Sequence, residues 1–407
     1  MARHSRAVYR RRRLVVFTTA SVVLSLTTGL VAVGLAPLPS AAVTATTTTD
    51  FTSEPAEIAV PPFGATAVQA DGYGLLTGTN LDAVVPIASI AKVVTALVVL
   101  EARPILNGEA GDDITFDSQD VQWLNDSVAN AESRADVIEG MTLSARDVIS
   151  VMLVKSANNY SRTLARWAFG SEESFVQAAN DWATRQGLSE TVIADSSGLS
   201  PATQSSLSDL LRIGELALDN PVTAQAVASA TISVNPIGDL ENSNDLLGTL
   251  GVNGIKTGTT DEAGACLLYS ANLPVGDGSV RIIGVTLGAP DHDSLDAAVT
   301  QLLSSIQLGF HVVTPVRAGE ALAIAETMWN TTSSLSSTET LSRVVWSSTP
   351  VIVSLPSSIG GVGETESPAG SFRVQFGDES VAVEMVRMSD MTDPGLPWRV
   401  AHLSEIF

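Results

Sequence analysis

Ser89 and Lys92 stand three residues apart in the run Pro86-Ile87-Ala88-Ser89-Ile90-Ala91-Lys92. At the start of a helix, this spacing places a hydroxyl and an amine on one face, one turn apart. The helix dipole favours a developing anion there, and an apolar environment lowers the pKa of a lysine until its neutral amine can act as a base. The pair is therefore a candidate nucleophile and base. Taken alone, the pattern is explained more simply by a helix cap and a solvated lysine.

Two further polar stretches follow along the chain. Ser156-Ala157-Asn158-Asn159 interrupts two apolar helical segments, and alone it is explained by the capping of a helix junction. Lys256-Thr257-Gly258-Thr259 opens a predicted strand hairpin, where an ammonium and a hydroxyl would stand beside a groove. Gly258, without a side chain, would let a ligand approach the backbone. Alone, this run is an ordinary turn with a surface lysine.

The three patterns in this order resemble the S-x-x-K, S-x-N and K-T-G signature set of penicillin-binding proteins and class A β-lactamases. More closely, residues 58–310 resemble the D-alanyl-D-alanine carboxypeptidases, the low-molecular-mass penicillin-binding proteins among the serine peptidases. The matching runs are IASIAKVVTA (87–96), SANN (156–159), SGLS (197–200), SDLL (208–211), NSNDLL (242–247) and GIKTGTTDEAGACL (254–267). The last run is the most specific.

The resemblance implies hydrolysis of the bond between the two terminal D-alanines of a peptidoglycan stem peptide. Ser89 would be the nucleophile that forms an acyl-enzyme, Lys92 would accept its proton, and Ser156 would pass a proton to the leaving D-alanine. Water would then release the acyl group. The resemblance also implies that β-lactam antibiotics are covalent inhibitors, and it implies no metal or cofactor.

The expected substrate-binding residues are Asn158, Lys256, Thr257, Gly258 and Thr259. By the same resemblance, Asn158 would hold Lys92 and the substrate amide. Lys256 would bond Ser156 and supply positive potential for the terminal carboxylate, to which the Thr257 and Thr259 hydroxyls would bind. The backbone N–H groups of Ser89 and Thr259 would form an oxyanion hole.

Some positions depart from the family pattern. Ser243 stands where some relatives carry Arg, and the turn 289–293 also lacks an Arg that others have. Carboxylate binding is therefore expected to rest on Lys256 and the threonines. Asp291-His292-Asp293 is interpreted as a solvated turn rather than a metal cluster. Cys266, the only cysteine, is interpreted as a buried strand residue rather than a reactive thiol.

Other functions stay open as alternatives. A β-lactamase of the same fold would need an extra Glu for deacylation, and no Glu-x-x-Leu-Asn follows the second motif. Endopeptidase cleavage of cross-links is closer chemistry and fits the same motifs. A catalytically retired wall-binding scaffold is opposed by the three intact motifs, because an inactive relative is expected to have lost part of them.

The pattern of elements predicts an α+β protein. Helices are expected at 89–102, 142–154, 159–169, 173–186, 208–218 and 294–308, and strands within 58–88 and at 252–259, 266–273 and 280–287. This order indicates an α+β arrangement with mostly antiparallel pairing. The family resemblance implies a penicillin-binding, β-lactamase-like transpeptidase fold, an antiparallel sheet with a helical subdomain, over residues 58–315. Residues 316–407 read as a small all-β domain. Pro394-Gly395-Leu396-Pro397-Trp398 breaks the last stretch, and no amphipathic C-terminal helix is expected.

The N-terminal residues have the pattern of a targeting segment. Six of the 22 basic residues precede Leu14, and residues 14–36 carry no charge. Residues 1–45 are therefore expected to be a signal peptide or an N-terminal membrane anchor, with the remainder extracytoplasmic. Residues 46–57 are Thr-rich and read as a linker. The net charge of −22 argues against a nucleic-acid partner.

Overall fold

The computed structural model describes residues 6–106 and 108–407, and these divide into two compact units. The central unit comprises residues 56–311. The outer unit comprises the described residues up to Pro55 together with Val312–Phe407. The chain therefore passes through the outer unit both before and after the central one.

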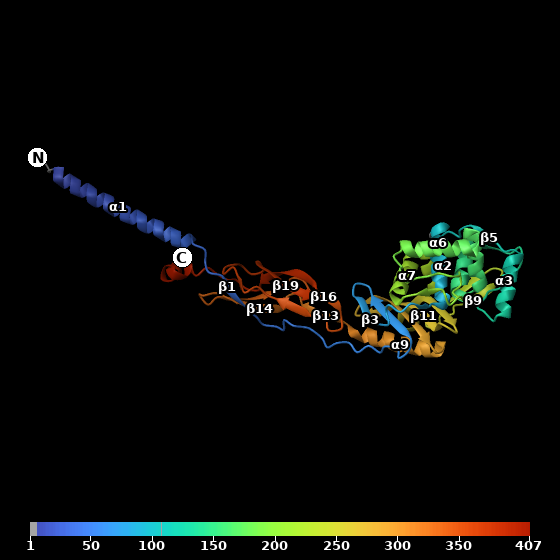
Figure 1. The fold of residues 1–407 in the computed structure, drawn as a ribbon. Helices are drawn as coiled ribbons and strands as arrows, with labels where there is room; N and C mark the ends of the chain where they lie inside the picture. The colour runs from blue at the N-terminus through green and yellow to red at the C-terminus, as the bar shows by residue number, and fades with distance from the viewer. Residues whose placement is uncertain (1–5, 107) are drawn as a thin grey trace. The chain divides into compact units, whose positions relative to one another are not determined.

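A five-stranded antiparallel sheet organises the central unit, in the order β10-β11-β12-β2-β3. Its strands are β2 (Ala65–Ala70), β3 (Gly74–Thr79), β10 (Val252–Thr260), β11 (Gly264–Val275) and β12 (Gly278–Ala289). Strands were predicted within residues 58–88, and residues 58–64 form none. β11 and β12 are buried along almost their whole length, as expected for strands covered on both faces. Helices α7 (Leu207–Asp219) and α9 (His292–Gly309) lie on opposite sides of the sheet (Figure 1).

Helix α2 (Ala91–Ala102) is the core of the helical part of this unit. Its residues from Ala91 to Leu100 are all buried, because the sequence is apolar around the whole helix. The surrounding helices are α3 (Ser118–Ala129), α4 (Ala145–Lys155), α5 (Asn158–Phe169), α6 (Glu172–Arg185) and α8 (Pro221–Ala228). Helices α4, α6 and α7 begin at serine caps, whose hydroxyls accept a hydrogen bond from the third residue of the helix.

Short elements complete the central unit. The 3₁₀ turns are η1 (Ala88–Ile90) and η2 (Thr249–Gly251). Two-stranded pairs are formed by β4 (Val85–Pro86) with β7 (Gln204–Ser205), β5 (Asp113–Thr115) with β6 (Thr142–Ser144), and β8 (Thr231–Val234) with β9 (Gly238–Glu241). The predicted helix 89–102 is thus a 3₁₀ turn followed by an α-helix, and Ser89 lies in the turn.

The outer unit is built on a seven-stranded antiparallel sheet in the order β17-β19-β20-β15-β14-β1-β18. Its strands are β1 (Ala41–Ala45), β14 (Ala321–Glu326), β15 (Thr332–Ser336), β17 (Val351–Ser354), β18 (Ser358–Ile359), β19 (Pro368–Phe376) and β20 (Glu379–Arg387). A separate pair joins β13 (Phe310–Val316) to β16 (Leu341–Trp346).

Strand β1 belongs to this sheet although it precedes the central unit in the sequence. Val43 pairs with Ala325 of β14, and Ala41 is completely buried. Beyond the strand, the Thr49 carbonyl accepts a hydrogen bond from Val353, and the Phe51 N–H donates to Val351. The sequence predicts a targeting segment and a linker here, whereas the structure pairs residues 41–51 with the late strands (Figure 1).

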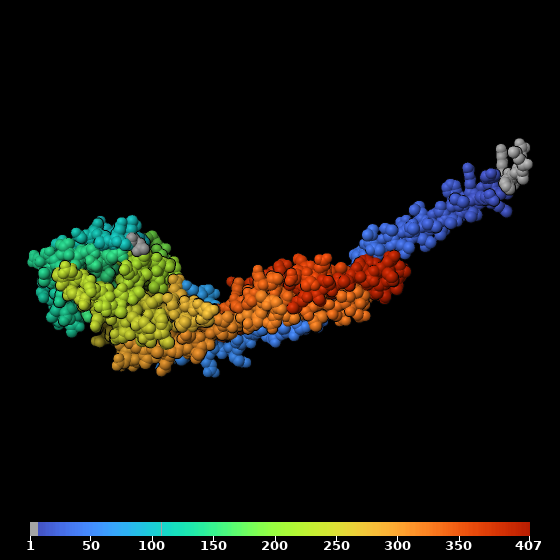
Figure 2. All heavy atoms as spheres, turned by 180° about the vertical axis from the view of Figure 1, so that it is seen from behind, coloured from blue at the N-terminus to red at the C-terminus, as the bar shows by residue number. Residues whose placement is uncertain are grey.

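Helix α1 (Arg6–Leu35) precedes this strand. The segment Ala7–Leu35 is long and apolar enough to cross a membrane, and none of its most apolar window is buried. Two short helices, α10 (Gly395–Ala401) and α11 (Leu403–Ile406), end the chain. The predicted break at residues 394–398 was wrong, because Pro394 is the N-cap of α10 and Gly395 is its first residue. Arg399 of α10 donates to the carbonyls of Val33 and Ala36, where α1 meets the C-terminal residues (Figure 2).

Candidate active site

Ser89 and Lys92 meet at the junction of η1 and α2. The Lys92 Nζ lies 2.8 Å from the Ser89 Oγ. Ala88, directly before the serine, adopts a left-handed backbone conformation with φ 46°, which is strained for a residue with a side chain. Ser89 is half-buried, whereas Lys92 is completely buried. The hydroxyl is therefore reachable while its amine partner is shielded from solvent.

The electrostatics of Lys92 favour a neutral amine. Burial, and secondarily the charge of Lys256, hold the pKa of Lys92 well below its usual value, against the opposing charges of Asp195 and Glu132. The Lys92 Nζ also donates to the Ser197 carbonyl at 2.8 Å. That bond orients the amine, so that its lone pair can take the proton of Ser89.

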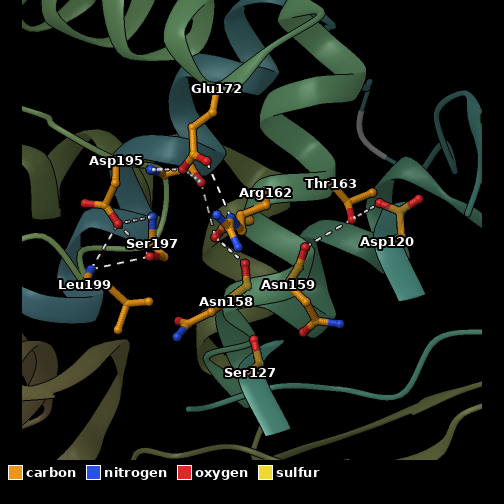
Figure 3. Close-up of polar contacts among 12 residues, drawn as sticks. Asp120, Ser127, Asn158, Asn159, Arg162, Thr163, Glu172, Asp195, Ser197 and Leu199 are labelled. Atoms are coloured by element: carbon orange, nitrogen blue, oxygen red, sulfur yellow. Dashed lines mark hydrogen bonds and ion pairs between the residues drawn. The ribbon is translucent and has the colours of Figure 1, made fainter. Parts of the chain in front are cut away.

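The loop that supplies this carbonyl is held by Asp195 (Figure 3). Its Oδ2 accepts from the Ser197 N–H at 3.2 Å, from the Ser197 hydroxyl at 2.6 Å and from the Leu199 N–H at 3.0 Å. Its Oδ1 accepts from the Thr203 hydroxyl at 2.6 Å. Gly198, at φ 81°, packs so closely that a Cβ would lie 1.8 Å from the Ala88 carbonyl oxygen. The loop and the Ser89 turn therefore fix each other.

Ser156 and Asn158 occupy the junction of α4 and α5. Ser156 caps α4 in a left-handed conformation, with φ 59°, and both side chains are buried. The Asn158 Nδ2 donates to the Glu132 Oε2 at 3.1 Å. Its Oδ1 is buried without a hydrogen-bond partner among the described residues. The expected contact from Asn158 to Lys92 is therefore replaced, among these residues, by a contact to Glu132, which the sequence analysis missed.

Strand β10, at the edge of the sheet, carries the third motif. Lys256 is buried, and burial lowers its pKa to about 7. Its Nζ donates to the Thr257 carbonyl at 2.9 Å and to the Ser243 hydroxyl at 3.4 Å. The expected partner Ser156 is not among its hydrogen bonds to the described residues. The hydroxyls of Thr257 and Ser243 lie 2.7 Å apart. Ser243, which the sequence analysis noted only as a position where some relatives carry Arg, is therefore part of this cluster.

Gly258 and Thr259 lie at the contact between β10 and the Ser89 turn. A Cβ on Gly258 would lie 3.4 Å from the Ile87 carbonyl oxygen and closer still to the Ser89 backbone. The Thr259 Oγ1 lies 2.6 Å from the Nε2 of His292, the first residue of α9. The prediction of a solvated turn at 291–293 is therefore wrong for His292, because this residue begins α9 and its ring contacts Thr259 of β10.

Two clefts adjoin these residues. One, of about 770 Å³, is lined by Glu132, Arg162, Glu172, Asp195 and Ser197 among others. The second, of about 570 Å³, includes Glu132, Arg134, Lys155 and Ser243. Glu132 contributes to both clefts and bonds Asn158 between them. The first cleft reaches Ser197, whose carbonyl bonds Lys92, and the second reaches Ser243, which bonds Lys256.

Cys266 lies on β11, opposite Gly258 in the register of β10 and β11. It is completely buried in β11, as predicted, and burial raises its pKa to about 11. A thiol with a raised pKa is a poor nucleophile. Among the described residues, no group of three or more His, Cys, Asp or Glu side chains is placed to hold a metal ion.

Comparisons with known proteins agree with this geometry. A family model described as D-alanyl-D-alanine carboxypeptidase matches residues 52–291. D-alanyl-D-alanine carboxypeptidase DacA of Escherichia coli (strain K12) is 29% identical over 246 residues, which cover 60% of this chain and 59% of that protein. A D-alanyl-D-alanine endopeptidase of Pseudomonas aeruginosa is 31% identical over 206 residues, which cover 49% of this chain and 63% of that protein. The chain thus spans about three fifths of the length of these curated relatives.

Two solved structures share the fold. A mutant of the Streptomyces K15 DD-transpeptidase superposes with a TM-score of 0.54 and 24% identity, over 60% of this chain and 98% of that one. Penicillin-binding protein 5 from Haemophilus influenzae gives a TM-score of 0.57 and 21% identity, over 84% of this chain and all of the other. The predicted fold class, a helical subdomain with an antiparallel sheet followed by a β-rich region, is confirmed.

Proposed function

The chain belongs to the D-alanyl-D-alanine carboxypeptidase family, and from that premise we propose that it removes the terminal D-alanine from peptidoglycan stem peptides through an acyl-enzyme on Ser89. The observation that carries the proposal is the 2.8 Å contact between the Ser89 Oγ and the buried Lys92 Nζ. A serine needs such a base to be an effective nucleophile at neutral pH.

In acylation, the Ser89 Oγ attacks the carbonyl of the penultimate D-alanine while Lys92 takes the hydroxyl proton. The backbone N–H groups of Ser89 and Thr259 bind the developing oxyanion. The C–N bond then breaks, and the nitrogen of the terminal D-alanine receives a proton through Ser156. In deacylation, water attacks the ester, its proton passes to Lys92, and Ser89 regains its hydrogen.

Substrate binding is assigned to Asn158 and to strand β10. The Asn158 Oδ1, which has no hydrogen-bond partner within residues 6–106 and 108–407, is available to the N–H of a bound peptide, because a buried acceptor without a partner is costly unless a ligand satisfies it. The Thr257 and Thr259 hydroxyls and the charge of Lys256 are proposed to bind the terminal carboxylate. A bound carboxylate also favours the charged form of Lys256.

We place this activity outside the cytoplasm. Helix α1 begins with a basic cluster and continues as an apolar segment, the order expected when the following residues are exported. If the segment is retained, it anchors the enzyme in the membrane. The β-rich residues 312–407 then contact the end of the anchor, because Arg399 donates a hydrogen bond to the Ala36 carbonyl.

Mass spectrometry of the purified chain tests the proposal. After incubation with penicillin we expect a long-lived penicilloyl adduct on Ser89, and with diacetyl-Lys-D-Ala-D-Ala we expect release of D-alanine. An adduct without D-alanine release would point to endopeptidase work, the activity named for the relative from P. aeruginosa. Rapid penicillin turnover without an adduct would indicate a β-lactamase, and neither reaction would indicate a non-catalytic scaffold.

A further inference from the structure

Thr259 and His292 come from distant parts of the chain and meet at one hydrogen bond. Thr259 is an exposed residue of β10, and His292 is the half-buried first residue of α9. The Thr259 Oγ1 and the His292 Nε2 are 2.6 Å apart. Thr259 shares its face of the strand with Thr257, because alternate residues of a strand point to the same side. The histidine therefore contacts Thr259, one of the two threonines whose hydroxyls are proposed to bind the substrate carboxylate.

The protonation of His292 decides which way the Thr259 hydroxyl points. A hydroxyl has a single hydrogen to donate. When the His292 Nε2 carries a proton, it donates to the Thr259 oxygen, and the hydroxyl hydrogen is free to bind a carboxylate. When Nε2 is bare, the hydroxyl donates to the ring and turns only lone pairs toward the cleft. A protonated imidazole carries a hydrogen on both nitrogens, so protonation enforces the first arrangement.

Several ionisable side chains lie near His292 in the sequence or interact with its charge. Asp291 and Asp293 flank His292 in the sequence, and Asp296 follows on α9. Burial raises the pKa of Asp296, the charge of His292 lowers it, and Asp245 and Asp293 raise it further. Asp245 reaches this cluster from the segment before η2. Lys256 lies on β10, three residues before Thr259, and Asp261 and Glu262 follow in the turn between β10 and β11.

We propose that His292 is a positioning residue that points the Thr259 hydroxyl at the substrate's terminal carboxylate, so that recognition of the carboxylate weakens as the imidazole loses its proton. The inference rests on the proposed function and extends it. It assigns the carboxylate subsite a histidine, where the other side chains of the subsite are threonines and a lysine.

The test compares the wild type with His292→Gln and His292→Arg, and with His311→Gln as a matched control that removes a different histidine. We would measure kcat and KM for D-alanine release from diacetyl-Lys-D-Ala-D-Ala between pH 5 and 9. For His292→Gln we expect a KM about tenfold higher at pH 5.5, with kcat changed much less, because a hydrogen bond to a charged group is lost. His292→Arg should keep the low KM and remove its pH dependence. His311→Gln should resemble the wild type.

A second substrate separates positioning from structural damage. The same peptide with a C-terminal amide lacks the carboxylate, and its reaction should be equally affected by pH in all four proteins. An equal loss on both peptides, or a wild-type pH profile of KM that persists in His292→Gln, would overturn the inference. Ratios of variant to wild type at each pH cancel the titration of Lys92, which all four proteins share.

Penicillin provides a readout that survives failure of the proposed peptidase activity. Penicillin carries a carboxylate but requires no release of D-alanine, so its rate constant of acylation can be measured even in a protein that does not cleave the peptide. A wild type that is acylated but releases no D-alanine would refute the proposed function alone. Acylation with the same pH dependence in the wild type and His292→Gln would refute the role of His292.

Discussion

A Cβ atom on Gly258 would lie 2.8 Å from the backbone nitrogen of Ser89. Strand β10 therefore touches the turn that carries the proposed nucleophile, with no room for any side chain between them. The same Cβ on Gly258 would lie 3.0 Å from the Ala88 Cβ, so a side chain at residue 258 could be accommodated only by moving the backbone. The glycine of the third motif sets the position of the serine relative to the sheet.

Gly258→Ala should lower the rate constant of penicillin acylation by about tenfold to a hundredfold, because a small misplacement of a reacting group has effects of this order. Stopped-flow fluorescence with a labelled penicillin measures this rate. Gly278→Ala is the control, since its nearest contact for a Cβ is 4.0 Å. Equal rates in Gly258→Ala and the wild type would show that β10 moves freely away from the turn.

Ser89→Ala should abolish the penicilloyl adduct, because Ser89 carries the hydroxyl that Lys92 contacts at 2.8 Å, whereas the other oxygen bonded to Lys92 is the Ser197 backbone carbonyl. Intact-mass spectrometry detects the adduct, and circular dichroism with a thermal melt checks that the variant is folded. An adduct that persists on the folded variant would move the nucleophile to another residue.

Lys92→Ala should slow acylation by about a hundredfold to ten-thousandfold, the usual range for loss of a general base. In the wild type the pKa of Lys92 is held well below its usual value of 10.5 by burial first and by Lys256 second. Acylation should therefore stay fast at neutral pH and fall as the pH drops through that lowered pKa. A pH-rate profile from pH 5 to 10 measures it. A profile identical in wild type and variant would require a different base.

Lys256→Met should remove a pH dependence of stability. Burial lowers the pKa of Lys256 to about 7, from 10.5 in a free side chain. Between these values the unfolded chain binds a proton that the folded chain lacks, so the free energy of unfolding rises with pH. Urea unfolding at pH 7 and at pH 9.5 should show a larger rise in the wild type than in Lys256→Met. Equal rises would mean that Lys256 stays charged in the folded protein.

Asp195→Asn should slow acylation about tenfold although Asp195 is outside the three motifs. Its carboxylate accepts four hydrogen bonds from the loop that presents the Ser197 carbonyl to Lys92, and an amide nitrogen cannot accept any of them. Asp219→Asn, at the exposed end of α7, is the matched control. Wild-type acylation in a folded Asp195→Asn would show that the loop does not position Lys92.

The sequence predicted the helices and strands that carry the motifs because their patterns are local. The all-apolar run after Lys92 indicates a buried helix, and the alternation around Gly276-Asp277-Gly278 indicates a hairpin, both of which the structure contains. The proximity of Ser89 and Lys92 also follows from spacing alone. Their roles stay predictions until the experiments above are made.

Contacts between distant segments were out of reach of the same reasoning. Lys256 bonds Ser243 rather than Ser156, and His292 meets Thr259, because tertiary packing brings these residues together. No local pattern marks them. Likewise Ala41 to Ala45 read as the end of a targeting segment, since five small residues show no periodicity, yet they form a strand in the late sheet.

The pairing of β1 with β14 imposes an order on folding. The Thr46 hydroxyl bonds the Ala321 carbonyl, 275 positions later, so β1 leaves the ribosome long before its neighbour exists, and closing so long a loop in an unfolded chain is costly in entropy. The central unit removes that cost, because its own two ends meet where the Ala59 N–H donates to the Ser305 hydroxyl at 2.9 Å. Folding of the central unit thus brings the two chain segments of the outer unit close together, so that β1 can pair with β14.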